Sequence, residues 1–151
     1  MSEHEEVRAL YKRLIGRWNH RDASGMASLF TDDGSQVGFD GSAINGRLEI
    51  EAHLAPIFAK HPTPPFICKV REVRRLGDSA ALLRAIVGMV PPGSVDINPA
   101  LNAIQTLVAE RVDGHWRVAL FQNTPAAFHD RPEEAQAFSA ELRKLLAEAR
   151  A

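Results

Sequence analysis

Several residue types and patterns that mark particular classes of protein are scarce or absent in this chain. Cys68 is the only cysteine among 151 residues, which excludes an internal disulfide and a multi-cysteine metal site. No stretch approaches the roughly 20 consecutive apolar residues of a membrane span. The acidic start at residues 1–6 is not followed by the apolar run of a secretory signal. We therefore expect a cytoplasmic protein with no membrane partner.

Strong charge and the common cofactor motifs are missing as well. A formal net charge of −1 offers no positive field, so nucleic acid is not an expected partner. The six histidines include no pair at i, i+4 spacing beside a suitable acid. Glycine-rich phosphate loops and the Gly-x-Ser-x-Gly turn of hydrolases are also absent. The sequence therefore predicts neither a metal nor a cofactor.

What is present is the composition of an ordinary soluble domain. Hydrophobic residues make up 45% of the chain and charged residues 25%, both close to the average. A length of 151 residues allows one hydrophobic core with room for a pocket. No linker or internal repeat divides the chain, so we expect a single domain over residues 1–151.

Two helices are expected at the start of the chain. Apolar side chains recur every three or four positions over 7–18, the pattern of an amphipathic helix. Asp22 is placed to cap a second helix over 23–30. The turn-forming residues 32–34 are expected to end that helix and to lead into a short strand over 35–39.

A third helix is expected after the turn at residues 40–42. Gly46 precedes it, and Pro56 within it is expected to kink or shorten it, because the proline ring clashes with the carbonyl four residues earlier. The apolar residues on one face of this helix are Ile50, Leu54, Ile57 and Phe58.

The rest of the chain shows the pattern of strands and a final helix. Val73 breaks the alternation of the first strand, which suggests a bulge. Asp113-Gly114 is a strong hairpin signal between the last two strands. Asp130 and Pro132 mark the start of a helix over 132–149. This order favours an α+β fold with helices on one face of an antiparallel sheet. The expected strands cover 66–76, 80–90, 100–112 and 115–124.

An ordered set of short motifs resembles the nuclear transport factor 2-like superfamily, which includes ketosteroid isomerases and SnoaL-like polyketide cyclases. The segment 121–125 and the helix after it resemble the SgcJ/EcaC-type group of that superfamily. The motifs are Trp18-Asn19-x-x-Asp22, Leu29-Phe30-Thr31-Asp32-Asp33-Gly34, Gly46-Arg47-x-x-Ile50-x-x-x-Leu54 and Asp113-Gly114-His115-Trp116-Arg117-Val118.

The resemblance implies a cone-shaped, curved antiparallel or mixed sheet whose concave face is closed by three N-terminal helices. It further implies an apolar pocket for a small apolar or aromatic molecule, and a homodimer formed through the convex face. Ketosteroid isomerases carry their proton-transferring groups at three positions that match Leu14, Gly38 and Val108 here. None of these side chains can exchange a proton, so that form of isomerisation is not expected.

Strand alternation within such a fold predicts which side chains face the pocket. A shift of one residue would exchange the two faces of a strand. The residues expected to face inward are Gln36, Gly38 and Asp40; Leu83, Ala85, Val87 and Met89; Asn102, Ile104, Thr106 and Val108; and Ala119, Phe121 and Asn123.

Asp40 and His53 are the candidate catalytic pair. A carboxylate on the first strand and an imidazole on the third helix could meet at the pocket mouth and act as a general base. Alternatively, Asp40 simply belongs to its turn and His53 is an exposed helix residue.

The candidate ligand-binding residues are mostly apolar. Asn123 and Thr106 could orient a ligand by neutral hydrogen bonds, although Asn123 could equally serve to end its strand ahead of Pro125. Met89 and Phe121 could belong to the core instead, and Trp18 could be core, pocket wall or both. The full set is Trp18, Leu54, Ile57, Met89, Thr106, Phe121 and Asn123.

Two functions of different classes remain open at this point. One is a cofactor-free enzyme that catalyses proton transfer, cyclisation or dehydration on an apolar or aromatic metabolite. The other is a non-catalytic module that binds a ligand or forms a dimer.

Overall fold

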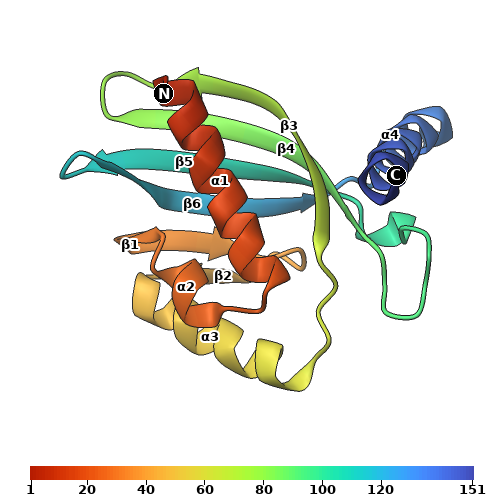
Figure 1. Cartoon of the computed structure of the whole chain (residues 1–151), viewed down its shortest axis with the longest axis horizontal. Helices are drawn as coiled ribbons and strands as arrows, with labels where there is room; N and C mark the ends of the chain where they lie inside the picture. The colour runs from red at the N-terminus through yellow and green to blue at the C-terminus, as the bar shows by residue number, and fades with distance from the viewer.

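A six-stranded sheet and four helices make up the computed structural model, which describes residues 1–151 (Figure 1). The helices are α1 (Glu3–Asn19), α2 (Ala23–Ala27), α3 (Arg47–Lys60) and α4 (Pro132–Arg150). The strands are β1 (Phe30–Val37), β2 (Ala43–Asn45), β3 (Phe66–Arg75), β4 (Ala80–Met89), β5 (Ala103–Val112) and β6 (His115–Pro125), with a 3₁₀ turn, η1, at Pro99–Leu101.

The sheet is mixed, and its strand order is β2-β1-β6-β5-β4-β3. Only β1 and β6 pair in parallel, and the remaining neighbours are antiparallel. Helices α1, α2 and α3 lie on one face of the curved sheet, whereas α4 stands apart from them at one end (Figure 1). The expected α+β fold is thereby confirmed. None of the four helices has the length and apolar composition that crossing a membrane requires.

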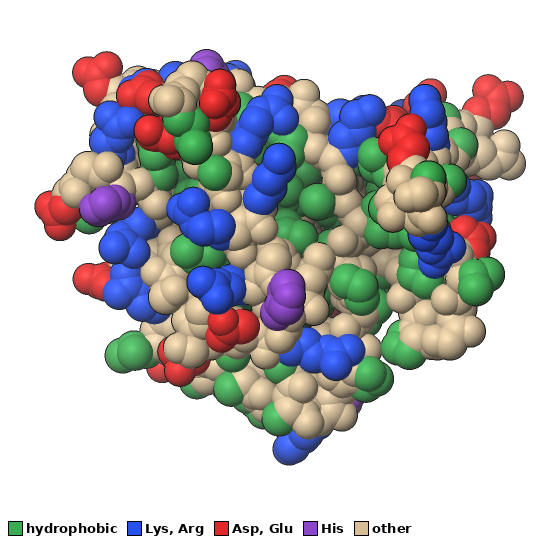
Figure 2. All heavy atoms as spheres, in the orientation of Figure 1, with side chains coloured by type: hydrophobic (Ala, Val, Ile, Leu, Met, Phe, Trp, Pro, Cys, Tyr) green, Lys and Arg blue, Asp and Glu red, His purple; other side chains and the backbone are tan.

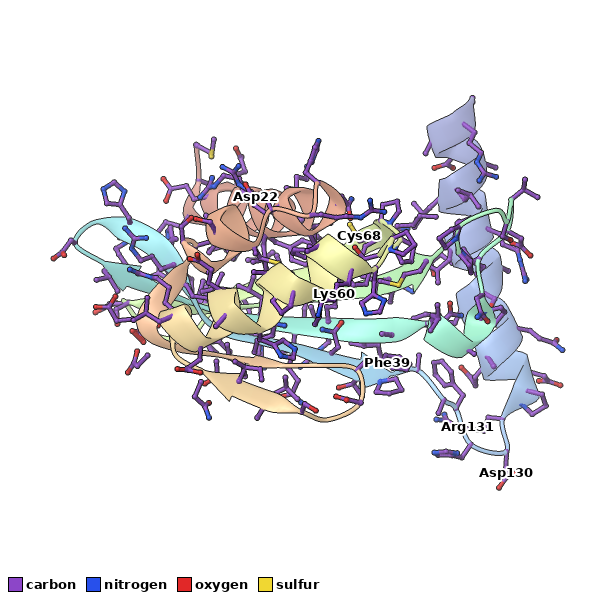
Figure 3. The ribbon with its side chains drawn as sticks, turned by 90° about the horizontal axis from the view of Figure 1, so that it is seen from below. Asp22, Phe39, Lys60, Cys68, Asp130 and Arg131 are labelled. Atoms are coloured by element: carbon purple, nitrogen blue, oxygen red, sulfur yellow. The ribbon has the colours of Figure 1, made fainter.

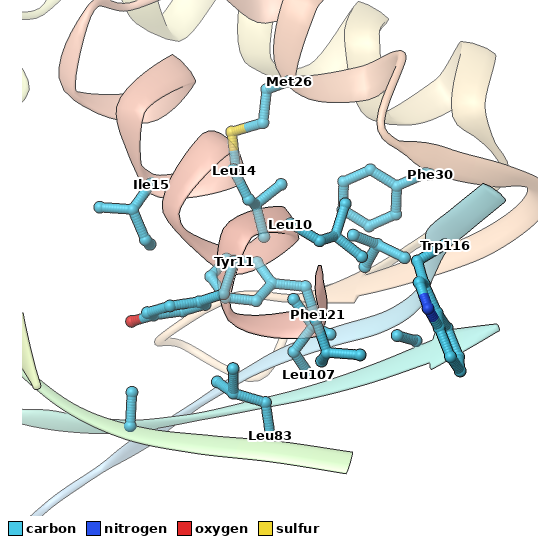
Figure 4. Packing of buried hydrophobic residues seen from close by; sticks show 14 of the residues in the cluster. Leu10, Tyr11, Leu14, Ile15, Met26, Phe30, Leu83, Leu107, Trp116 and Phe121 are labelled. Carbon is cyan, nitrogen blue, oxygen red and sulfur yellow. The ribbon is translucent and has the colours of Figure 1, made fainter. Parts of the chain in front are cut away.

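The main core lies between α1 and the sheet. The buried stripe of α1 includes Leu10, Tyr11 and Leu14, which project toward the strands that carry Leu83 and Leu107 (Figure 4). Each large apolar side chain buried in this way contributes about 1.5–3 kcal/mol to stability. On the solvent side of the molecule, Lys and Arg side chains gather over α1 (Figure 2). The amphipathic pattern of this helix is therefore what holds it on the sheet.

A second, smaller core forms under α4. Phe138 and Leu142 of that helix pack against Ile86 of β4 and Ile97 of the following loop. Side chains of β4 on the other face, such as Leu83, belong to the main core. The long apolar run of β4 is thus explained by cover on both faces.

The Asp-Asp-Gly segment at residues 32–34 is not a turn, contrary to expectation. It lies inside β1, at an irregularity between Phe30 and Ser35 in the pairing with β6. Gly34 is required there, because a Cβ atom would lie 2.8 Å from the Val118 carbonyl oxygen. The Arg47 guanidinium fixes the segment by donating to the Phe30 carbonyl at 2.7 Å. Residues typical of turns therefore serve a bulge here.

Three other local expectations were wrong at their boundaries. Helix α2 is capped by Asp22 as expected, but it ends at Ala27, because Phe30 already belongs to the sheet. The irregularity of β3 lies between Val70 and Glu72 rather than at Val73. Strand β5 begins at Ala103, because residues 99–101 form the η1 turn.

Helices α3 and α4 also differ from the expectation, α3 at its internal proline and α4 at its N-terminal cap. Helix α3 runs through Pro56 to Lys60 without being shortened, since Ala52, whose carbonyl loses its partner, is exposed to water. Helix α4 has Arg131 at its N-cap position and no side-chain cap. Asp130 has a φ of 58°, whereas a capping residue needs an extended backbone. Figure 3 shows both residues in the loop that leads into α4.

The hairpin between β5 and β6 is confirmed. Asp113 and Gly114 have φ angles of 51° and 80°, which is the conformation of a two-residue type I′ turn. Val112 pairs with His115 directly across it.

Candidate functional site

A cavity of about 330 Å³ lies between the three N-terminal helices and the concave face of the sheet. Its size falls at the lower end of the range for small-molecule sites. Ten of its fifteen lining residues are hydrophobic, and none is Lys or Arg. The lining residues are Trp18, Met26, Gln36, Gly38, Phe39, Asp40, His53, Leu54, Ile57, Phe66, Met89, Leu101, Ala103, Phe121 and Asn123.

The cavity brings together most of the side chains singled out in the sequence. Gln36, Gly38 and Asp40 line it from β1 and the turn after it, as strand alternation predicts. The inward face predicted for β4 agrees with the packing, because Leu83 and Ala85 belong to the main core and Met89 lines the cavity. The candidate residues on the wall are Trp18, Asp40, His53, Leu54, Ile57, Met89, Phe121 and Asn123.

Thr106 is the one candidate residue that does not line the cavity. It pairs with Arg84 and Gln122 on the outer face of the sheet, while Ala103 and Gln105 of the same strand point inward. The prediction exchanged the inward and outward faces of β5. It was therefore also wrong in expecting Asn102, Ile104 and Val108 to face inward. Because β5 starts after η1, the sequence pattern alone does not fix its register.

A bulge in β6 explains a second error in predicting which side chains face inward. Val108 pairs with Leu120 and Ala109 with Val118, so Ala119 is an extra residue. The inward face therefore changes from Val118 before the bulge to Phe121 after it. Ala119 was wrongly expected to face inward, whereas Phe121 and Asn123 do so.

Asp40 and His53 both line the cavity at its mouth, and no direct hydrogen bond joins them. Both side chains are exposed, and Asp40 Oδ1 accepts from the Ser42 backbone N–H at 2.9 Å. This hydrogen bonding to Ser42 lowers the pKa of the Asp40 carboxyl, and the positive charge of His53 adds a smaller effect. Asp40 is therefore both a turn residue and a residue of the mouth.

Trp18 forms one wall of the cavity and is anchored on its other side. Its indole N–H donates to the Pro64 carbonyl at 3.1 Å, which supplies the partner that a half-buried indole needs. The ring centroids of Phe58 and Phe66 lie 5.2 and 5.1 Å from its own. These contacts hold the indole in place beside the cavity.

Sequence reasoning missed a chain of buried polar side chains that reaches the cavity. Tyr11 donates to Gln105 Oε1 at 2.6 Å, and Gln105 Nε2 donates to Asn123 Oδ1 at 3.0 Å. Burial raises the pKa of the Tyr11 hydroxyl, and the nearby Cys68 raises it further. The one signal for this chain was a single tyrosine on a buried helical stripe, because a buried hydroxyl needs a partner.

Gln36 is the other polar side chain of note on the wall. It is 7% exposed, and its Oε1 is buried without a hydrogen-bond partner. No group of three or more His, Cys, Asp or Glu side chains is placed to hold a metal ion. The polar groups within the cavity are thus neutral amides, and the titratable ones stand at the rim.

Comparison with known proteins agrees with this architecture. A family model described as a SnoaL-like domain matches residues 7–123, and no curated protein matches the chain. A domain of unknown function with a cystatin-like fold from Nostoc punctiforme superposes with a TM-score of 0.79 at 22% identity, covering 99% of this chain and 95% of that one.

Two further solved structures share the fold at lower identity. A ketosteroid isomerase-like protein from Erwinia carotovora atroseptica has a TM-score of 0.68 at 16% identity, with 83% of this chain and 98% of that one covered. An NTF-2 like protein of unknown function from Shewanella oneidensis has a TM-score of 0.61 at 17% identity, with 80% and 97% covered. With its family match and this shared fold, the chain belongs to the SnoaL-like domain family of the nuclear transport factor 2-like superfamily.

Proposed function

We propose that this protein binds a small, uncharged apolar or aromatic molecule in the cavity. The observation that carries the proposal is the cavity itself: about 330 Å³ with ten hydrophobic residues among fifteen in its lining. Trp18, Leu54, Ile57, Met89 and Phe121 would contact the apolar body of the ligand. The absence of Lys and Arg from the lining disfavours an anionic ligand, which would lose its hydration without gaining a partner.

Filling the cavity tests this proposal. Ala103 lies on the wall and is 2% exposed, so Ala103→Phe places an aromatic ring in the space that a ligand needs. We expect the affinity for the neutral fluorescent probe N-phenyl-1-naphthylamine to fall at least tenfold, which is about 1.4 kcal/mol. Fluorescence titration measures the affinity, and urea denaturation checks that the variant folds.

Thr106→Phe is the matched control, because Thr106 lies three residues along the same strand on its outer face. It should leave the affinity for the probe unchanged. Equal affinities of the wild type and the Ala103→Phe variant would contradict the proposed site.

A catalytic role is a second candidate, favoured by the position of Asp40 and His53 at the same mouth. Asp40 stays ionised because hydrogen bonding to Ser42 lowers its pKa, so a carboxylate is present at the mouth together with the imidazole. A histidine near neutrality can give up or take a proton at the edge of a bound ligand. The reaction would be a cofactor-free proton transfer, cyclisation or dehydration. The ketosteroid isomerase-like protein from Erwinia carotovora atroseptica has the same fold, and this likeness of fold supports a catalytic role.

Substitution at the mouth separates the enzyme from the carrier. If catalysis occurs, Asp40→Asn and His53→Ala should each lower turnover of a bound substrate at least a hundredfold, the usual contribution of a general acid or base. Both variants should keep the affinity for N-phenyl-1-naphthylamine. Full turnover in both would leave the carrier as the function.

We also propose that two copies of the chain associate through the outer face of the sheet. Leu82, Val108 and Leu120 form a row there across three neighbouring strands, and all three side chains are half-buried. Such a row is apolar surface that a second sheet could cover.

A further inference from the structure

The hydrogen bonds from Tyr11 through Gln105 to Asn123 form a polar chain behind the cavity, and they all run toward the cavity. Their direction determines whether Asn123 presents a donor or an acceptor to a ligand. Tyr11 is fully buried and donates its hydrogen to Gln105 Oε1 at 2.6 Å. Gln105 is also fully buried and passes the interaction on, because its Nε2 donates to Asn123 Oδ1 at 3.0 Å. The Asn123 oxygen is therefore occupied from behind. Its Nδ2 donates to no protein group, and Asn123 lines the cavity.

Hydrogen bonds in the reverse direction, from Asn123 toward Tyr11, are disfavoured by the groups that would then face each other. If only the Asn123 amide were turned, its NH₂ group would face the NH₂ group of Gln105, and two donors would meet. If both amides were turned, Tyr11 would have to accept from Gln105 and direct its hydrogen at Cys68. Cys68 lies near enough to raise the pKa of the Tyr11 hydroxyl, but sulfur is a weak acceptor. The amide oxygen of Gln105 is the better partner for the tyrosine hydrogen.

Tyr11 and the nearby Cys68 both stay protonated at neutral pH, so Tyr11 keeps the hydrogen that it donates to Gln105. Burial raises the pKa of the Tyr11 hydroxyl and, against a smaller opposing effect of the Tyr11 hydrogen bond, that of the Cys68 thiol.

We propose that Tyr11 and Gln105 are positioning residues that fix Asn123 as a hydrogen-bond donor, so that the bound molecule presents an uncharged acceptor oxygen to it. This inference rests on the proposed ligand-binding function and narrows its ligand class. A carbonyl or ether oxygen on an apolar ring system meets the requirement. A carboxylate does not, because the lining contains no Lys or Arg and the mouth carries the ionised Asp40.

A pair of probes that differ by one oxygen tests the inference. Tetralin and 1-tetralone share a bicyclic skeleton, and only the ketone can accept from Asn123. We expect the wild-type protein to bind 1-tetralone roughly three- to tenfold more tightly, the value of one net neutral hydrogen bond. Titration followed by ¹H–¹⁵N NMR gives both affinities, and the side-chain NH₂ signal of Asn123 should shift with the ketone alone.

Two variants test the roles of Asn123 and Tyr11 in the polar chain. Asn123→Asp replaces the donor by an acceptor of the same shape, and Gln105 Nε2 keeps its partner, so the preference for the ketone should vanish. Tyr11→Phe removes the hydrogen that orients Gln105, and the ketone-to-hydrocarbon ratio should fall below about twofold. Leu10→Val is the control, because it trims a fully buried neighbour of Tyr11 on α1 outside the polar chain. It should destabilise the protein and leave the ratio unchanged.

The outcomes separate the inference from the function on which it rests. If neither probe binds saturably in the cavity, the proposed function fails. If both probes bind wild type equally well, or if Asn123→Asp keeps the preference, the assignment of Asn123 as donor is overturned. If Tyr11→Phe folds and keeps the wild-type ratio, Tyr11 has no positioning role and the chain is merely structural.

Discussion

Two buried glutamines show how differently the same side chain can be used in one protein. Gln105 has partners for both its oxygen and its nitrogen, whereas the oxygen of Gln36 has none. A buried polar atom without a partner costs about 1–3 kcal/mol, and a satisfied one adds about 0.5–1.5 kcal/mol. Gln36 lines the cavity and Gln105 does not. The costly group is thus found where a ligand could supply the missing partner.

Substituting the two glutamines should therefore have opposite effects on stability. Gln36→Leu removes the unpaired oxygen and should leave the free energy of unfolding unchanged or raise it by about 1 kcal/mol. Gln105→Leu strands the Tyr11 hydroxyl and the Asn123 amide, and should lower it by about 2–3 kcal/mol. Urea denaturation at pH 7 measures both values. Equal losses in the two variants would show that Gln36 is satisfied in solution.

At the scale of elements, α4 is held by charged contacts as well as by its apolar stripe. Glu141 accepts from both Arg71 Nη1 and Nη2 at 2.6 Å and lies 3.2 Å from Lys69 Nζ. Hydrogen bonding to Arg71, followed by the contacts with Lys69, lowers the pKa of Glu141. Between the ordinary pKa of glutamate, 4.5, and the lowered value, the unfolded chain binds more protons than the folded one. The stabilisation is complete above the ordinary value and is lost as the pH falls through the lowered one.

Glu141→Gln should remove this acid dependence. Relative to wild type, the variant should lose less than about 1 kcal/mol at pH 7, because the pair is partly exposed to water, and a smaller amount at pH 3. Urea denaturation at several pH values between 3 and 7 measures the difference. Glu148→Gln, on the same helix without an ion pair, should show no such convergence. A loss at pH 3 as large as that at pH 7 would mean that the carboxylate charge is not what anchors α4.

The elements also show how far the sequence can be interpreted. Periodicity identified the first and third helices, the last helix and the four long strands, since 3.6-residue and two-residue patterns report which side is buried. The second helix was identified from its Asp22 cap. Periodicity failed at Gly34 and Ala119, where bulges shift the alternation of inward and outward side chains and the residue types give no sign of the shift. Thr106 was misplaced for a similar reason, because the start of β5 depends on the η1 turn before it. Eight of the nine candidate site residues still reached the cavity wall.

The polar chain lies beyond that kind of prediction. Tyr11 and Gln105 are 94 residues apart in sequence, and no local pattern says that they meet. Their contact follows from helix α1 lying across the sheet, which is a property of the whole fold. Asn123 was expected from strand alternation, whereas the partner that orients it was not.

At the scale of the whole molecule, the outer face of the sheet is the surface through which we propose that two copies of the chain pair. The proposed pairing through Leu82, Val108 and Leu120 predicts a species of twice 16.6 kDa in sedimentation velocity. Val108→Asp places a charge in the middle of the row and should yield the single chain at the same concentration, because a buried unpaired charge is costly. Leu48→Asp is the control, since Leu48 is 81% exposed on α3, away from that face. A wild-type protein that sediments only as the single chain would contradict the pairing.

The parallel pairing of β1 with β6 has a consequence for how the protein is made. Phe30 lies beside Val118, so the first strand to leave the ribosome must wait for the last before its edge is satisfied. Pairings between such distant segments form slowly, since a long loop has to close first. The hollow between them can exist only once β6 has been synthesised. Until then the apolar residues that will line it are exposed, and a chain interrupted before β6 would carry an unpaired strand edge that invites aggregation.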